Sequence, residues 1–155
     1  MLELMNSNKV ITVNRKAYHD YSILESIEAG LVLTGTEVKS LRQGKVNLKE
    51  AFCRIKDGEV FINNMNISPY EQGNRENHDP TRVRKLLLHQ EEIAKLTRKV
   101  EERGLSLVPT KIYFKESRAK LEIGIGRGKK LHDKRETEKK RDWAREKGRL
   151  LKERG

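Results

Sequence analysis

The sequence contains three adjacent His-Asp pairs, whose side chains are of the types that bind divalent metals in phosphohydrolases. They are His19-Asp20, His78-Asp79 and His132-Asp133. A metal site needs several such ligands to converge, together with partners that orient them. One pair precedes a predicted strand, one lies in a predicted loop and one begins the charged C-terminal segment. The pattern therefore favours polar surface pairs, and we expect no metal site, no cofactor and no catalytic residue.

The glycine-rich stretch GIGRGKK, residues 124–130, resembles a phosphate-binding loop in composition but not in spacing. In the P-loop pattern, Ile123 would stand where the first glycine belongs, and Lys130 where Ser or Thr belongs. In the dinucleotide-binding pattern, Lys129 would replace the third glycine. Both motifs are excluded. We expect instead that these glycines let the chain leave a strand.

Basic residues gather in two clusters beside side chains that can stack on unpaired bases. Arg forks suit phosphates, and His or Trp can stack on bases, so such clusters favour RNA binding. No helix-turn-helix pattern accompanies them, which disfavours DNA. The first cluster, around His78, contains Arg75, Arg82, Arg84 and Lys85, and the second, around His132, contains Arg127, Lys129, Lys130, Lys134 and Arg135.

The distribution of charge also indicates a polyanionic partner. The chain has 155 residues, of which 37% are charged, and its net charge is +11. Residues 126–155 hold 13 Lys and Arg against 6 Asp and Glu, whereas the first 125 residues hold 21 against 17. A positive field at one end is typical of proteins that bind nucleic acid or membrane surfaces. The interleaved acids disfavour a polybasic membrane anchor.

The remaining composition predicts a cytoplasmic protein. Cys53 is the sole cysteine, which excludes an internal disulfide and fits a reducing compartment. Its alternating apolar surroundings predict a buried side chain rather than a nucleophile. The N-terminal MLELMNSN is too short an apolar run for a signal peptide, and no stretch is long enough to span a membrane.

Alternating apolar residues predict a chain of about six strands with two or three helices. The clearest hairpin covers residues 50–68 around the turn pair Asp57-Gly58, and a second covers 105–128 with a turn at 116–118. We also expect a strand over 10–15, and two strands over 21–35 joined by a tight turn at 28–30. Apolar spacing predicts helices over 36–43 and 89–104, whereas Pro, Gly and Asn indicate a long loop over 68–84.

These elements predict a mainly β fold, a small antiparallel barrel of the oligonucleotide/oligosaccharide-binding (OB) type with inserted helices. The domain should cover residues 1–128. Residues 129–155 form a basic tail whose apolar stripe, at Trp143, Ala144, Leu150 and Leu151, is too thin to fold alone. We therefore expect the tail to be disordered when free and helical when bound.

Five stretches together resemble the tmRNA-binding small protein B family, also called the SsrA-binding protein family. In chain order they are NRKAYHDY, EAGLVLTGTEVKSLRQGK, DGEVFINNMNISPY, DPTRVRKLLLHQEEI and GKKLHDKRE. The resemblance implies an OB-type barrel that binds the tRNA-like domain of transfer-messenger RNA. It implies delivery of that RNA to stalled ribosomes for trans-translation, the rescue of ribosomes on broken messages. It also implies that the tail enters the decoding centre and the empty message channel as a helix, and we expect a monomer on the RNA.

The resemblance also assigns site residues by position. The family's RNA contacts match Glu28, Leu87 and Lys120, and the basic neighbours Arg15, Arg82, Arg84 and Lys85 are candidate additions. The family's decoding-centre and tail positions match Gly128, Lys129, Lys130, His132, Asp133, Lys134, Arg135 and Trp143.

Two other functions and one departure from the family stay open. An RNA-processing enzyme would need a convergent acid-base or metal cluster, and a structural ribosomal protein would stay on ribosomes regardless of stalling. The N-terminal MLELMNSN lacks the Lys-rich leader of many members, which puts an N-terminal RNA contact in doubt. Either Met1 or Met5 is the start.

Overall fold

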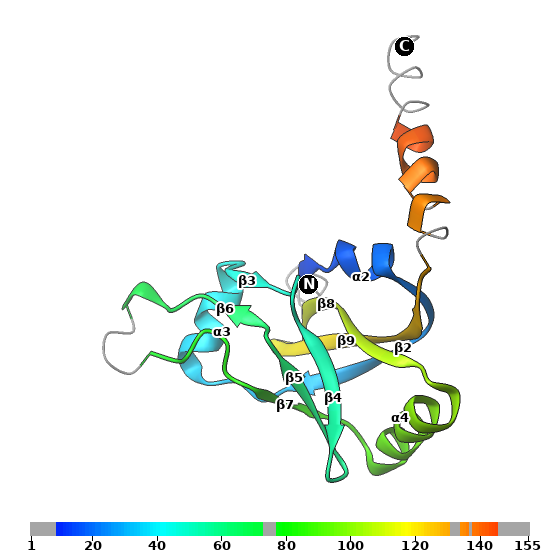
Figure 1. The fold of residues 1–155 in the computed structure, drawn as a ribbon. Coiled ribbons are helices and arrows are strands. Elements are labelled where there is room, and N and C mark those ends of the chain that lie inside the picture. Colours follow the sequence, from blue (N-terminus) through cyan, green and yellow to red (C-terminus); the bar gives the residue numbers. More distant parts are fainter. Residues whose placement is uncertain (1–8, 73–76, 131–133, 137, 146–155) are drawn as a thin grey trace.

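The computed structural model describes residues 9–72, 77–130, 134–136 and 138–145 (Figure 1). Its elements are, in chain order, β1 (Lys9–Val13), α2 (Arg15–Asp20), β2 (Tyr21–Leu31), α3 (Gly35–Arg42), β3 (Val46–Asn47), β4 (Phe52–Lys56), β5 (Glu59–Asn63), β6 (Asn66–Ile67), β7 (Arg84–Leu87), α4 (Gln90–Arg103), β8 (Ser106–Lys115) and β9 (Arg118–Gly128).

One antiparallel sheet of seven strands dominates the fold, in the order β1-β8-β9-β2-β7-β5-β4. The short strands β3 and β6 form a second pair. The sheet curls around one apolar core, and α4 buries Ile93 and Leu96 against it. The mainly β, OB-type prediction is confirmed, although in the described strand order β1 and β4 remain edges, so the barrel is open.

Both predicted hairpins form. Each has a two-residue turn whose positive φ angles suit the right-handed twist of the two strands that it joins. Asp57 and Gly58 join β4 to β5, both with positive φ, as expected for an Asp-Gly pair. Glu116 and Ser117 join β8 to β9 and also have positive φ. Positive φ is unfavourable for Glu and Ser. The long pairing of β8 with β9 on either side therefore determines this turn, rather than the turn residues themselves.

The two predicted helices are confirmed, and their ends have the expected capping residues. Thr34 caps α3: its side chain accepts from the Glu37 amide, and the Glu37 carboxylate accepts from the Thr34 amide at 2.8 Å. Gly104 ends α4 in the left-handed conformation. Helix α2 was not predicted, because its six residues are too few to show a helical period.

Three predictions about strands are wrong. The expected turn at residues 28–30 does not exist, because β2 runs unbroken from Tyr21 to Leu31. A Cβ on Gly30 would lie 3.4 Å from the Cβ of Leu87, an ordinary van der Waals contact, so neither a turn nor crowding requires glycine at this position. The strand β7, which begins at Arg84 where the predicted loop ends, was not predicted. The described residues therefore contain nine strands rather than six.

The glycines of GIGRGKK also differ from expectation, since Gly124 and Gly126 lie inside β9 and not at its exit. They pair with Ser26 and Ile23 of β2, next to a bulge in that strand. A Cβ on Gly126 would lie 2.2 Å from the carbonyl oxygen of Ser22. These glycines therefore permit close approach of two backbones.

Candidate nucleic-acid interface

The register of four adjacent strands brings three of the predicted RNA contacts, Glu28, Leu87 and Lys120, onto one face. Gly30 of β2 lies opposite Leu87 of β7 on one side and opposite Lys120 of β9 on the other. Glu28 is two residues from Gly30, so it points to the same face. Tyr113 of β8 lies opposite Lys120 and extends the row. We call the face that carries Tyr113, Lys120, Glu28 and Leu87 the sheet platform.

The sheet platform combines an exposed apolar side chain with charged groups. Leu87 is 54% exposed, unusually high for a leucine in a central strand. Lys115 of β8 approaches Glu28, with its Nζ 3.6 Å from Oε1. The Tyr113 hydroxyl donates to Oε2 of Glu28. This surface can contact phosphates through Lys, and sugars or bases through Leu and Tyr.

Electrostatics keep Glu28 ionised on this face. The hydrogen bond from Tyr113 lowers the pKa of the Glu28 carboxyl; partial burial opposes this effect, and Lys115 and Lys120 lower the pKa further. Burial and then the neighbouring Glu28 raise the pKa of the Tyr113 phenol. At neutral pH the phenol is therefore the donor and the carboxylate the acceptor.

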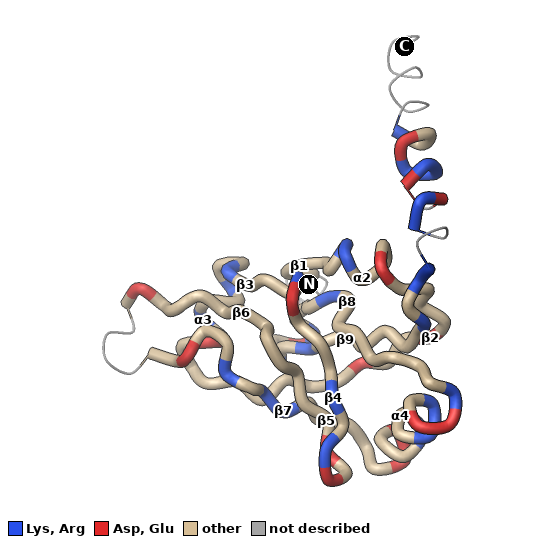
Figure 2. The backbone as a smooth tube through the Cα atoms, in the orientation of Figure 1, with Lys and Arg blue, Asp and Glu red and all other residues tan. Residues whose placement is uncertain are grey.

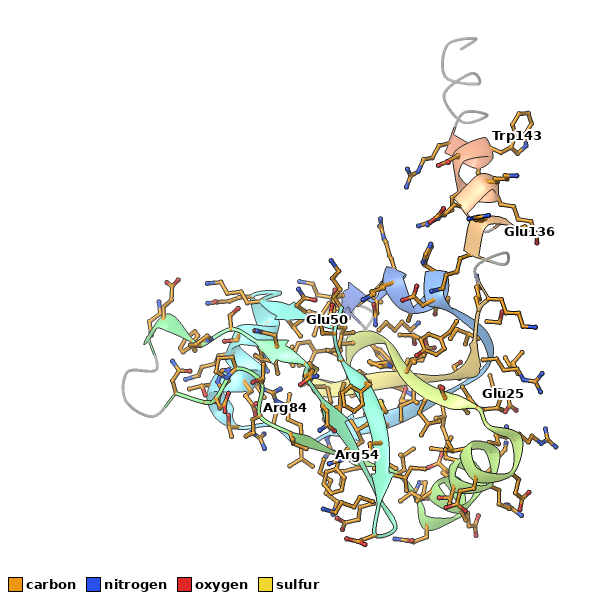
Figure 3. The ribbon with its side chains drawn as sticks, in the orientation of Figure 1. Glu25, Glu50, Arg54, Arg84, Glu136 and Trp143 are labelled. Atoms are coloured by element: carbon orange, nitrogen blue, oxygen red, sulfur yellow. The ribbon has the colours of Figure 1, made fainter. Side chains whose placement is uncertain are left out.

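The structure corrects the assignment of Arg84 as an RNA-contact residue. Its guanidinium is completely buried, and it donates to the Glu37 carboxylate, to the Met65 carbonyl at 2.6 Å and to the Pro80 carbonyl at 3.1 Å (Figure 3). Arg84 therefore holds β7 to α3 and cannot contact RNA directly. Arg82 shares Glu37, with its Nη2 2.6 Å from Oε1, and remains partly exposed.

The other basic candidates occupy separate positions. Lys85 lies on β7 and pairs with Glu59 at 2.8 Å, where both side chains are half exposed. Arg15 is exposed at the start of α2, on a different element from the platform strands. Lys85 therefore lies on one of the platform strands, whereas Arg15 lies at the end of α2 away from Tyr18 and Asp20, which contact the tail.

The tail leaves the body beside α2, where polar contacts hold its first residues. The amide of Lys129 donates to the Asp20 carbonyl at 2.8 Å, and its Nζ donates to the Tyr18 carbonyl at 3.0 Å. Lys134 Nζ lies 3.4 Å from an Asp20 carboxylate oxygen. We call this group, which His19 and Glu138 complete, the tail root.

His19 joins α2 to the tail helix. Its Nδ1 lies 2.9 Å from Asp20 Oδ1, and its Nε2 lies 2.7 Å from Glu138 Oε1. The hydrogen bonds to Asp20 and then Glu138 raise the pKa of the His19 imidazole. The hydrogen bond from His19 lowers the pKa of Asp20. The first His-Asp pair thus links the tail to the body.

The described tail residues 135–136 and 138–145 are helical and exposed (Figure 1). Blue and red positions alternate along them in Figure 2, so cations and anions share the helix. Trp143 is 66% exposed and points outward (Figure 3). Gly128 ends β9 and Lys130 is exposed, whereas His132 and Asp133 lie outside the described residues. Disorder of the free tail stays a prediction.

The remaining candidates for chemistry have structural partners. His78 is bonded through Nδ1 to Thr36 Oγ1 at 2.9 Å and through Nε2 to the Ile67 carbonyl at 2.8 Å. Burial raises the pKa of the Cys53 thiol, which packs against the core. In the described parts of the chain, no three His, Cys, Asp or Glu side chains gather as a metal site would require. Nor is any helix there both long and apolar enough to cross a membrane.

The sequence did not reveal that Tyr113, Lys111 and Lys115 of β8 lie on the same face of the sheet as the platform residues. The alternation in KIYFK was the available signal, because it places these three side chains on one face of β8 and Phe114 in the core. Which neighbour they would face depends on the pairing of β8, β9 and β2, which no local pattern gives.

Comparison with known proteins provides an independent line of evidence. A family model described as "SmpB protein" matches residues 11–153. The SsrA-binding protein of Syntrophotalea carbinolica is 67% identical over 94% of this chain and 97% of its own length. That of Mesorhizobium japonicum is 59% identical over 96% and 94%. A chain from the solved structure "tmRNA-SmpB: a journey to the center of the bacterial ribosome" is 55% identical, with a TM-score of 0.66 over 79% of this chain and 86% of that one.

Proposed function

The chain belongs to the SmpB family, and on that premise we propose that it binds transfer-messenger RNA and acts with it on stalled ribosomes in trans-translation. It performs this role by binding and catalyses no reaction, and its place of action is the cytoplasm. The RNA lies against the sheet platform, and the tail reaches into the ribosome.

The observation that carries the proposal is the exposed row across β8, β9, β2 and β7. A leucine, a lysine and a tyrosine side chain share it, and Gly30 between them leaves a low point in the row. RNA recognition uses such surfaces, since apolar and aromatic groups contact bases and riboses while cations contact phosphates. The ionised Glu28 accepts a hydrogen bond from a base amino group.

The tail is assigned a different partner, the decoding centre and the empty message channel. The channel is lined by ribosomal RNA phosphates, and a helix rich in Lys and Arg can pair with them where message is missing. The residues proposed for this contact are Gly128, Lys129, Lys130, His132, Asp133, Lys134, Arg135 and Trp143. The exposure of Arg135 and Trp143 supports the assignment, because a partner can reach these two side chains.

Sequencing of the RNA that co-purifies with the tagged protein tests the proposed partner. We expect transfer-messenger RNA to be strongly enriched. Glu28→Ala should reduce that enrichment although it makes the protein more positive, whereas Glu102→Ala, the same charge change on the exposed end of α4, should not. Enrichment of ribosomal RNA alone, from all ribosomes whether stalled or not, would indicate a structural ribosomal protein instead.

A further inference from the structure

Tyr113 is the platform residue to which neither the sequence nor the family resemblance gave a role. Its ring starts on β8, and its hydroxyl reaches Oε2 of Glu28 on β2, although β9 lies between these two strands. Two strand spacings amount to about 10 Å, so the side chain must lie along the sheet over Lys120. The hydrogen bond joins residues 85 positions apart and is part of the tertiary structure.

The ring and the hydroxyl of Tyr113 face different groups. Lys111 Nζ lies 5.6 Å from the ring centroid, close enough for a cation–π contact, and 3.8 Å from Glu122 Oε1. The hydroxyl donates to Oε2 of Glu28. The ring is therefore held by its own neighbours, and the hydroxyl position follows from it.

One oxygen of Glu28 remains available for a ligand. Tyr113 occupies Oε2, whereas Lys115 Nζ is 3.6 Å from Oε1, an ion pair that is too long for a hydrogen bond. A glutamate side chain on a strand surface has three rotatable bonds, and ordering it on binding costs side-chain entropy. A fixed donor on one oxygen removes part of that cost before the ligand arrives.

We propose that Tyr113 is a positioning residue of the RNA site, whose hydroxyl fixes the Glu28 carboxylate so that Oε1 accepts from the exocyclic amino group of a base. The inference rests on the proposed function, because it deepens the role of Glu28 in binding transfer-messenger RNA. A charged acceptor held in one orientation discriminates for an amino group and against a carbonyl at the same position. Tyr113 therefore contributes to specificity without contacting the base.

The first test measures binding of a transfer-messenger RNA transcript at fixed salt, by fluorescence anisotropy. Tyr113→Phe keeps the ring and removes the hydroxyl, and it should weaken binding about tenfold, equivalent to about 1.4 kcal/mol. In a Glu28→Gln background the same change should have little further effect. Tyr70→Phe, in the loop after β6, is the matched control and should bind as the wild type does. Thermal unfolding of each variant establishes that it is folded.

A second test needs no RNA and follows the Glu28 carboxyl carbon by NMR through an acid titration. The groups that face this carboxyl are the Tyr113 hydroxyl and Lys115 from β8 and Lys120 from β9. Removing the hydroxyl takes away a donor to the ionised form, so the pKa in Tyr113→Phe should rise towards the ordinary 4.5. Tyr70→Phe should leave the titration of Glu28 unchanged.

The outcomes separate the inference from its premise. If Tyr113→Phe binds RNA as tightly as the wild type and only Tyr113→Leu is weaker, the ring stacks on RNA and the positioning role is wrong. It is equally wrong if Tyr113→Phe costs the same with Gln at position 28, because the hydroxyl then acts on RNA directly. If the wild-type protein does not bind the transcript, the proposed function fails and the inference loses its premise, whatever the NMR titration shows.

Discussion

Replacing Glu37 by Gln should destabilise the protein severely, although the two side chains have nearly the same shape. Glu37 is completely buried and accepts hydrogen bonds from Arg84 Nε, from Arg82 Nη2 at 2.6 Å and from the Thr34 amide at 2.8 Å. Glutamine has no charge, and one of its terminal atoms is an amide nitrogen that would face a guanidinium donor. The buried Arg84 would lose its counter-charge.

The magnitude follows from the burial of Arg84. Removing one partner of a buried ion pair costs about 3–5 kcal/mol, because the remaining charge stays in a low-dielectric interior. Arg82 adds little, since its side chain is 36% exposed and water screens it. A domain of this size has about 5–15 kcal/mol of stability in total. With a urea dependence of about 2 kcal/mol per molar, the unfolding midpoint should fall by about 2 M.

Urea unfolding followed by circular dichroism measures this change, and Glu59→Gln is the matched control. Glu59 pairs with Lys85 at 2.8 Å, but both side chains are half exposed, so its loss should cost about 1 kcal/mol or less. If Glu37→Gln were as mild as Glu59→Gln, the structural role assigned to Arg84 would be wrong, and Arg84 would return as a candidate RNA contact.

Protonation of Glu37 should also make the stability of the fold fall at acid pH. Burial raises the pKa of Glu37, but the donors Arg82, Thr34 and Arg84 outweigh burial, and the folded-state pKa lies below the ordinary 4.5. A lowered folded-state pKa gives stability that is fully present above pH 4.5 and is lost as the pH falls through the folded-state value. Glu37→Gln should therefore be less sensitive to acid than the wild type, which unfolding curves at several pH values would measure.

Three further predictions concern the sheet and the tail. Gly126→Ala should cost about 1–3 kcal/mol in thermal unfolding, because its Cβ would collide with the Ser22 carbonyl, whereas Gly35→Ala enters open space and should be harmless; equal effects would contradict the packing role of Gly126. A chain that ends at Lys130 should still bind transfer-messenger RNA with an affinity that falls as salt rises, and loss of binding would show that the tail is part of the RNA site. Ala144→Pro should leave RNA binding intact and abolish tagging of stalled chains, since an interior proline costs a helix about 3 kcal/mol, and wild-type tagging would exclude a helical tail.

The parts of the fold that the sequence predicted are those with local causes. Asp57-Gly58 marks a turn wherever it stands between alternating runs, and Gly104 ends a helix of amphipathic spacing. Arg84 is the opposite case, since arginine is seldom buried and its counter-charge is 47 residues away on α3. Gly30 was predicted to form a turn because glycine is common in turns, and only the pairing of β2 with β7 and β9 shows that the strand continues through it.

The sheet platform and the tail root differ in how firmly the structure holds them, and this difference bears on function. The platform residues stand on central strands whose ladders fix their spacing, so the surface proposed to bind RNA is already formed without a ligand. The tail helix is held to α2 by polar pairs at the surface, His19 with Glu138 and Lys134 with Asp20. Exposed pairs of this kind contribute about 1 kcal/mol or less. Under the proposed function, phosphates of a ribosomal channel would replace them at small cost, and the tail would change partners while the platform kept its RNA.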